Sequence, residues 1–278
     1  MGLQLFDNPP GHLKRVLVMG ILNITPDSFS DGGQLNTRNA LDERITAMVT
    51  AGADIIDIGG ESSRPFAEPI SVDEELARII PAIRAVRKIT DLPISIDTTK
   101  ADVASEALVN GANIINDISA LRFDPDMARR AAEHDAPVIL MHMQGTPEDM
   151  QVAPTYDDVV KDIVDFLSER IEFARTKGIR KENIIVDPGV GFGKSLDHNL
   201  SLLKNMHIFS QLGCHVLLGH SRKSFMGKIL DLKVQERDTI TAVISALCVD
   251  KNISIIRVHD VLSTVHAVRM AEAILYAS

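Results

Sequence analysis

The sequence predicts an α/β protein that folds as a single (β/α)8 barrel of the TIM type. Short apolar, β-branched runs recur along the 278 residues, and each is followed by a longer segment with helical spacing. No linker, charge block or low-complexity stretch divides the chain into parts. Eight strand and helix units in one undivided domain favour a closed barrel, although an open doubly wound sheet would show the same alternation.

The candidate strands are short and apolar, as strands buried on both faces of a parallel sheet are. They are expected at residues 16–22, 54–58, 94–96, 113–116, 138–141, 184–186, 216–218 and 253–258. Residues 1–15 precede the first strand and are expected to form a short N-terminal extension that covers the bottom of the barrel.

The segments between the strands have the periodicity of amphipathic helices. Within residues 40–49, apolar side chains recur three and four positions apart. Asn36 or Thr37 can cap this helix, and Gly52 can end it. Later helices are expected to end in the same way, at Gly111, Gly178 and Gly213.

Composition and charge exclude several classes of protein. Hydrophobic residues make up 45% of the chain and charged residues 24%, which is typical of a globular domain. The net charge of -9 argues against a nucleic-acid partner, but a cleft can still gather cations for a small anion. No apolar run approaches the roughly 20 residues of a membrane helix, and no export signal is evident. We therefore expect a cytoplasmic protein in which Cys214 and Cys248 are buried, reduced thiols.

Polar side chains stand at the end of every predicted strand or just after it. Each one alone is explained by a helix cap or a turn. In a barrel, however, the carboxyl ends of all eight strands meet at one face, where barrel enzymes carry out their chemistry. The residues that predict such a face are Asn23, Glu61, Arg64, Asp97, Asn116, Asp117, His142, Asp187, Ser221 to Lys223, Arg257 and His259.

Three of these segments have properties of ligand-binding loops. Residues 23–33 form a long polar loop ending in two glycines, which suits a mobile lid or an ordinary surface loop. Residues 187–194 place three glycines around one aromatic ring, so their backbone could approach a flat ligand; they do not match the phosphate-binding P-loop pattern. Residues 221–224 open a helix directly after a strand, where free amides, hydroxyls and cations would hold a carboxylate or phosphate.

The last strand ends in two cationic side chains on one face. Arg257 and His259 are two residues apart, so they point to the same side of the strand. The apolar residues 253–256 before them indicate a buried strand. If this face points into the barrel, the two side chains form an anion clamp; if it points outward, they are a solvated pair.

At these residues the sequence resembles the dihydropteroate synthase family. The resemblance runs from Val18 to Ala273, and an ordered set of motifs is more specific than any one of them. The motifs lie at residues 19–33, 57–65, 94–98, 115–117, 140–145, 187–194, 221–224 and 257–260. The resemblance implies a transferase that condenses 6-hydroxymethyl-7,8-dihydropterin pyrophosphate with p-aminobenzoate to give 7,8-dihydropteroate and pyrophosphate in folate biosynthesis.

The resemblance also implies roles for the residues that match the pterin site. Asp187 would accept two N–H bonds from the amino-pyrimidine edge, and Asn116 would complete that edge. Asp97 would stabilise positive charge at the reacting methylene. Lys223 would donate to the pterin oxygen or ring nitrogen. Met141 is also expected to contact the substrate.

The remaining roles concern the diphosphate, the metal and the second substrate. Catalytic roles are expected for Asp97, Lys223, Arg257 and His259, the last two acting with Ser63, Arg64 and Ser221 around the diphosphate. Asn23 is expected to help hold Mg2+, a hard ion that prefers oxygen ligands. The p-aminobenzoate ring is expected near Pro65, Phe192 and Lys223, with its carboxylate near Ser224 and with Phe29 and Ser30 closing the pocket. Family members are commonly homodimers, although the sequence carries no interface signature.

Three residues differ from those expected in this family. Phe66 stands in place of glycine, Val190 in place of an aromatic residue, and His220 in place of an apolar one. Phe66 and Val190 predict an altered aminobenzoate pocket and altered sulfonamide affinity.

Other functions remain open at this point. A zinc hydrolase would use His142, His220 and His259, which end separate strands. A pterin-binding methyltransferase domain and a non-catalytic pterin-binding protein would share the contacts to the pterin edge.

Overall fold

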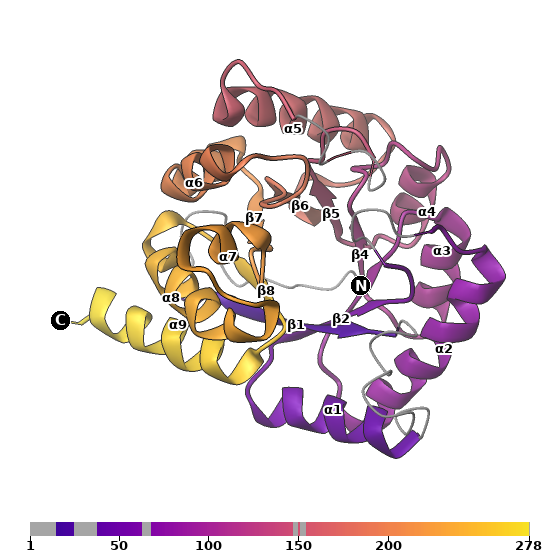
Figure 1. Cartoon of the computed structure of the whole chain (residues 1–278). Helices are drawn as coiled ribbons and strands as arrows, with labels where there is room; N and C mark the ends of the chain where they lie inside the picture. Colours follow the sequence, from indigo (N-terminus) through magenta and orange to yellow (C-terminus); the bar gives the residue numbers. More distant parts are fainter. Residues whose placement is uncertain (1–14, 25–37, 63–67, 147–149, 151–153, 278) are drawn as a thin grey trace.

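The predicted barrel is confirmed by the computed structural model, which describes residues 15–24, 38–62, 68–146, 150 and 154–277. Eight parallel strands follow one another in chain order around a closed barrel (Figure 1). Every predicted strand overlaps an observed one. The strands are β1 (Leu17–Asn23), β2 (Ile55–Gly59), β3 (Ile94–Asp97), β4 (Ile114–Asp117), β5 (Val138–Met141), β6 (Ile184–Asp187), β7 (His215–Leu218) and β8 (Ile255–Val258).

Helices surround the barrel and cover the outer face of the sheet (Figure 1). They are α1 (Arg38–Thr50), α2 (Val72–Ile89), α3 (Ala101–Val109), α4 (Met127–Glu133), α5 (Val159–Thr176), α6 (Leu196–Lys204), α7 (Ser224–Leu230), α8 (Asp238–Leu247) and α9 (Val261–Leu275). Short 3-10 helices lie at η2 (Lys181–Asn183), η3 (Met206–Leu212), η4 (Val234–Glu236) and η5 (Val249–Lys251). The connection from β7 to β8 contains two α-helices, α7 and α8, and this doubling becomes important at the functional site.

The glycines predicted to end helices lie just after helical segments, as the sequence predicts. Gly52 follows α1 with a φ of +89°, a left-handed conformation that glycine adopts without steric cost. Gly111, Gly178 and Gly213 also have positive φ. Ser71 and Asp158 cap α2 and α5 by accepting backbone N–H bonds. The candidate caps Asn36 and Thr37 lie outside the described residues.

The core has two parts, because each strand is buried on both faces. The larger part lies between strands and helices, where Ile58 packs with Ile79 and Ile83. The second part fills the inside of the barrel with one residue from each of seven strands. These residues are Met19, Ile55, Ile114, Ile139, Ile185, Leu217 and Ile255, and none is more than 1% exposed. Ser95 of β3 lies in register beside Ile114 and completes the layer.

The residues two positions further along each strand form the mouth of the barrel. Side chains two apart point to the same face of a strand, so these groups also face inward, one step closer to the carboxyl ends. They are Ile21, Asp57, Asp97, Asn116, Met141, Asp187, Gly219 and Arg257. We call this set the mouth layer. The predicted gathering of polar groups at one face is therefore a direct result of strand register above an apolar layer.

Charged groups stabilise the amino end of the barrel. Asp54 accepts a 2.9 Å bond from the backbone N–H of Val18 and pairs with Arg15 at 2.5 Å and Arg269 at 3.2 Å. Residues 1–14, which were expected to cover the bottom, lie outside the described residues.

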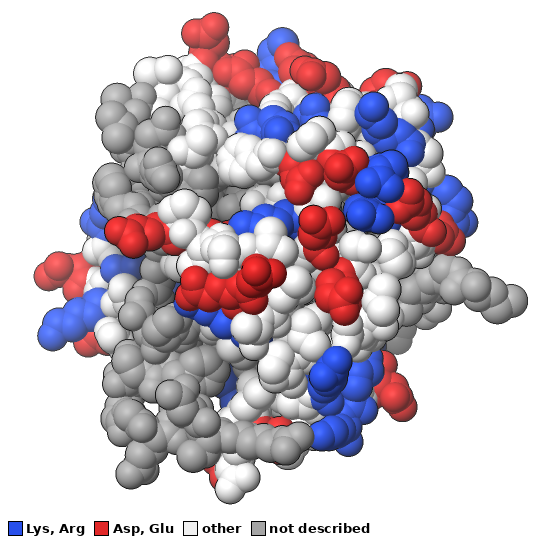
Figure 2. All heavy atoms as spheres, turned by 90° about the vertical axis from the view of Figure 1, so that its right-hand side faces the viewer, with Lys and Arg blue, Asp and Glu red and all other residues white. Residues whose placement is uncertain are grey.

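The surface and the thiols agree with the expectations from composition. On the face shown in Figure 2, basic and acidic side chains are interspersed. Cys214 and Cys248 are unpaired and buried, and burial raises the pKa of each thiol. Among the described residues, no helix has the length and hydropathy to cross a membrane.

We predict that Ile139→Ala lowers the free energy of unfolding by about 2–5 kcal/mol, because the barrel interior cannot collapse around the cavity. Val109→Ala is the matched control, since Val109 is 69% exposed and its truncation should change stability by less than about 0.5 kcal/mol. Urea denaturation of both variants checks this. Equal losses in the two variants would contradict the layered core.

Candidate active site

Arg257 lies at the centre of the mouth and joins two carboxylates from neighbouring strands. Its Nε donates to Asp57 Oδ2 at 2.7 Å, and its Nη2 donates to Asp97 Oδ2 at 2.7 Å. Burial disfavours a charged guanidinium, yet the two carboxylates raise the pKa of Arg257 above its ordinary value. Arg257 thus faces inward as predicted, but only part of its five N–H donors remain for an anion.

The surroundings of Asp97 disfavour the charged form of its carboxyl group. Burial raises the pKa of Asp97 to about 7; Arg257 opposes this rise, while Asp57 and Glu75 add to it. A carboxylate in this environment repels further negative charge and attracts any positive charge that develops beside it.

Asp187 and Lys223 form the opposite side of the mouth. Burial raises the pKa of Asp187 to about 6, although Oδ1 accepts a 2.7 Å bond from the Gly189 N–H and Lys223 lies near. A Cβ on Gly219 would lie 3.4 Å from Asp187 Oδ2, so the missing side chain leaves room beside that oxygen. Burial lowers the pKa of Lys223 to about 8, with Arg257 contributing in the same direction.

An amide and an apolar wall complete the pocket between these charges. The Asn116 Nδ2 lies 3.4 Å and 3.5 Å from the carboxylate oxygens of Asp57, which leaves its carbonyl for another partner. Met141, Met143 and Phe192 belong to one buried cluster next to the mouth. The Lys223 amine lies 3.7 Å from the centre of the Phe192 ring, a cation–π contact. The pocket can therefore take a flat polar heterocycle.

The glycines of residues 187–194 allow close approach to other parts of the protein. The approach of this backbone to a flat ligand stays a prediction. A Cβ on Gly189 would lie 1.9 Å from the His142 carbonyl oxygen, and one on Gly191 would lie 2.6 Å from Lys223 Cδ. Both glycines also have positive φ, so no other residue fits these positions without strain.

Lys194 also holds this loop in place. The residue is 4% exposed, and its amine donates to the Phe192 carbonyl at 2.8 Å and lies 3.0 Å from His142 Nδ1. Burial lowers the pKa of Lys194 to about 7 and that of His142 to about 2. The pair therefore holds Phe192 in place, and His142 is a structural partner of the loop rather than a mouth residue.

Ser221 and His259 are joined at the edge of the mouth. The Ser221 Oγ lies 2.9 Å from His259 Nδ1 and accepts the His259 backbone N–H at 3.1 Å. Burial lowers the pKa of His259 to about 3, and the neighbouring Arg222 and Arg257 add to the shift. His259 is therefore neutral at physiological pH. The neighbouring Arg222 does not behave as a free cation, because both arms of its guanidinium bind Asp238 at 2.7 Å.

Asn23 ends β1 next to the carboxylates of the mouth. It pairs in register with Gly59, which pairs in turn with Asp97. A Cβ on Gly59 would lie 3.4 Å from Asn23 Oδ1 and 3.6 Å from Asp97 Cβ. The Asn23 amide oxygen and the Asp97 side chain therefore lie on the two sides of Gly59.

Some of the predicted groups lie outside the described residues. These are Phe29, Ser30, Ser63, Arg64, Pro65 and Phe66. Glu61, just before residues 63–67, is held by an ion pair. Lys100 pairs with Glu61 at 2.8 Å and with the buried Glu75 at 2.6 Å. Glu61, predicted as a strand-end polar group, is therefore part of this ion pair. Asp117 similarly orders a turn by accepting N–H bonds from Ser119 and Leu121.

Sequence reasoning missed the part that Asp57 plays at this site. It lies in the middle of the apolar run of β2 and is fully buried, so it did not stand out as a strand-end residue. The available signal was its alternation: a carboxylate two positions after Ile55 must face the barrel interior, where a cation has to meet it.

Two of the departures from the family pattern lie away from the mouth. Val190 is fully buried in the main core cluster, and its effect on the aminobenzoate pocket stays a prediction. His220 is fully buried and hydrogen-bonds the Thr241 carbonyl of α8 at 2.9 Å. Among the described residues, no cluster of three His, Cys, Asp or Glu side chains could hold a metal.

We predict that Asp187→Asn stabilises the protein more at pH 8 than at pH 4. The folded pKa of Asp187, about 6, exceeds the ordinary value of 3.8, so the wild type loses stability as pH rises through this interval. The amide cannot lose a proton, and the difference between variant and wild type should grow by about 2–3 kcal/mol. Urea unfolding at both pH values measures it; a difference that is the same at pH 4 and pH 8 would refute the assignment.

Comparison with known proteins identifies the family. A family model described as a pterin binding enzyme matches residues 19–259. The dihydropteroate synthase of Synechocystis sp. is 46% identical over 262 residues, which cover 94% of this chain and 91% of the relative.

Solved structures are similar over nearly the whole chain. The dihydropteroate synthase of Yersinia pestis in a sulfonamide drug complex has a TM-score of 0.91 and 42% identity, covering 97% of this chain and 99% of that chain. The Xanthomonas albilineans enzyme in complex with 7,8-dihydropteroate has a TM-score of 0.86 and 40% identity, covering 95% of each chain. The chain belongs to the dihydropteroate synthase family.

Proposed function

We propose that this protein catalyses the dihydropteroate synthase reaction and that the two sides of the mouth bind different parts of the substrate. This reaction condenses 6-hydroxymethyl-7,8-dihydropterin pyrophosphate with p-aminobenzoate and gives 7,8-dihydropteroate and pyrophosphate in folate biosynthesis. One side would bind the flat pterin ring, and the other would neutralise the charge of the departing diphosphate. The observation that supports this most directly is the single layer containing Asp57, Asp97, Asn116, Asp187 and Arg257 above an apolar floor.

Pterin recognition falls to Asp187, Asn116 and Lys223. The unencumbered Oδ2 of Asp187 can accept N–H bonds from an amino-pyrimidine edge, and such charge-assisted pairs are strong in a buried site. The free carbonyl of Asn116 adds an acceptor. The Lys223 amine supplies a donor, while Met141 and Phe192 provide apolar surface for the ring faces. Binding the pterin would thus satisfy groups whose burial is costly in the empty pocket.

Asp97 is placed to favour cleavage of the bond to the diphosphate. As pyrophosphate departs, positive charge develops on the pterin methylene, and p-aminobenzoate then attacks through its weakly nucleophilic amine. A fixed carboxylate in a buried site stabilises such charge strongly, because it needs no reorganisation when the charge appears. The 2.7 Å bond from Arg257 holds Asp97 in position throughout.

The diphosphate would be met by cations and hydroxyl donors at the mouth edge. Arg257 keeps donors beyond the two that it gives to carboxylates. The Ser221–His259 pair offers one further donor, which is the Nε2–H of neutral His259 or the Ser221 hydroxyl according to the tautomer. Ser63 and Arg64 remain part of the proposal as predicted from the sequence.

A Mg2+ ion fits this edge only when it shares its ligands with the substrate. The amide oxygen of Asn23 is a suitable hard ligand, and it lies near Gly59 beside Asp97. Because no group of three His, Cys, Asp or Glu side chains among the described residues could hold a metal, most of the remaining ligands would be diphosphate oxygens and water. The ion would neutralise the leaving group.

The second substrate would bind next to Phe192 and Lys223, with its carboxylate toward Ser224. Pro65 was assigned to the same pocket from the sequence. Sulfonamides are expected to bind there too, as a sulfonamide drug is present in the Yersinia pestis complex. Phe66 and Val190 remain the residues predicted to alter sulfonamide affinity.

Three wider expectations are also proposed. A homodimer is supported by an apolar face on the adjacent helices α8 and α9, where Val243, Leu247, Met270 and Ile274 are 49–71% exposed. A cytoplasmic location is supported by two unpaired thiols. The whole chain, residues 1–278, is proposed to be one pterin-binding domain, and no nucleic-acid or membrane partner is expected.

Mixing the pterin pyrophosphate, p-aminobenzoate and Mg2+ with the protein should release pyrophosphate in step with dihydropteroate formation. Coupled phosphate detection and chromatography of the product measure the two. Binding of the pterin without pyrophosphate release would favour the non-catalytic pterin-binding alternative, and transfer of a methyl group would favour the methyltransferase.

We expect Asp97→Asn to lower kcat by about 10²–10³-fold while pterin binding remains measurable, because the amide keeps the shape but not the charge. Steady-state kinetics and calorimetric titration with the pterin separate the two effects. Turnover equal to that of the wild type would overturn the electrostatic role of Asp97.

A further inference from the structure

Arg222 has an unusual backbone conformation between two residues of the active site. Its φ is +56°, in the left-handed region that residues other than glycine rarely adopt because Cβ approaches the backbone. Ser221 precedes it and Lys223 follows it, so the conformation of residue 222 determines how these two side chains lie relative to each other. Something outside the turn must stabilise this conformation.

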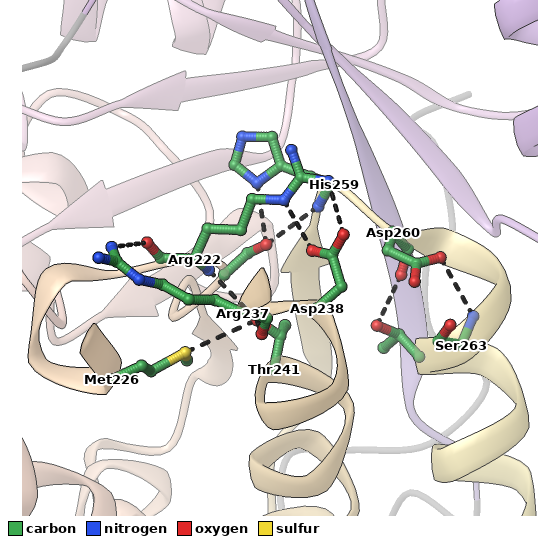
Figure 3. A network of polar contacts seen from close by, with 10 residues as sticks. Arg222, Met226, Arg237, Asp238, Thr241, His259, Asp260 and Ser263 are labelled. Carbon is green, nitrogen blue, oxygen red and sulfur yellow. Dashed lines mark hydrogen bonds and ion pairs between the residues drawn. The ribbon is translucent and has the colours of Figure 1, made fainter. Parts of the chain in front are cut away.

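The first turn of α8 holds Arg222 at three points (Figure 3). The backbone N–H of Arg222 donates to Thr241 Oγ1 at 3.2 Å, and its carbonyl accepts from Arg237 Nη1 at 3.0 Å. The guanidinium binds Asp238 through two parallel bonds of 2.7 Å, the geometry of a strong bidentate ion pair. Asp238 and Arg222 are 25% and 31% exposed, so this pair is partly shielded from solvent.

The result of this anchoring is visible on both sides of the turn. Ser221 reaches His259, whose ring nitrogen lies 2.9 Å from its hydroxyl. Lys223 points into the mouth, with its amine over the Phe192 ring and its stem against Gly191. A right-handed conformation at Arg222 would turn the chain between them, so the two side chains could no longer make both sets of contacts.

We propose that Asp238 is a positioning residue for the reaction: by holding the Arg222 guanidinium, it keeps the β7–α7 turn in the left-handed conformation that places Ser221 and Lys223. Asp238 itself touches no group of the mouth layer. The negative charge at the start of α8 also suits the positive end of the helix dipole, so the pair is favourable in place. The doubled helix after β7 therefore provides a fixed point for a catalytic turn.

The test uses the contrast between alanine and glycine at position 222. Both substitutions remove the guanidinium, but glycine adopts positive φ freely whereas alanine does not. If the backbone conformation matters, Arg222→Gly should retain about fivefold higher kcat/KM for the pterin pyrophosphate than Arg222→Ala. Asp238→Ala alone should lower kcat/KM about tenfold relative to the wild type. Added to Arg222→Gly, the same substitution should have no further effect.

Controls separate positioning from general stability. Asp165→Ala removes an exposed ion pair to Lys161 on α5 and should leave the kinetics unchanged. Asp238→Asn, which keeps the shape, provides a second variant if Asp238→Ala folds poorly, and melting temperatures are measured for all variants. The proposal is overturned if Arg222→Ala and Arg222→Gly lose activity equally, which would make the guanidinium a direct ligand. It is also overturned if loss of Asp238 has the same effect in both backgrounds or lowers only the melting temperature.

Discussion

The bridge from Arg257 to Asp57 and Asp97 is the interaction on which the mouth of this barrel depends. Two buried carboxylates on adjacent strands would repel each other, and one would take up a proton. The Arg257 guanidinium from the last strand lies between them and donates a hydrogen bond to each. This cation lowers the pKa of Asp97 and so favours its charged form.

Around this bridge, further contacts hold the residues that border the mouth. Lys194 and His142 fix the loop that carries Phe192, and two glycines let that loop pack tightly. Arg222, held by the start of α8, lies between Ser221 and Lys223. The positions of side chains at the mouth therefore depend on contacts made outside it.

The sequence was sufficient to predict the fold, because eight apolar runs and their helices leave few arrangements. It also indicated which face carries the chemistry, since polarity changes at the strand ends. The ion pairs of the mouth were not predictable. Arg257 lies 200 residues from Asp57 in the sequence, and periodicity does not show which carboxylate a cation contacts. Arg222 was interpreted as an anion-binding cation for the same reason, and the neutralising Asp238 on a later helix was not considered.

The glycines of residues 187–194 illustrate a related limit. Their number correctly indicated a close approach, but it could not show that His142, Lys223 and Gln144 lie against these glycines. Asp57 was hidden by its position within an apolar run.

The alternation that sets the mouth layer directly above the barrel's apolar layer also restricts how this protein can change in length. Deleting one residue within a strand would turn its mouth group outward, toward the helices, and bring an apolar side chain to the active face. Insertions and deletions can therefore accumulate only in the connections, so the spacing between chemical groups within the ring is preserved while the loops around it are free to diverge.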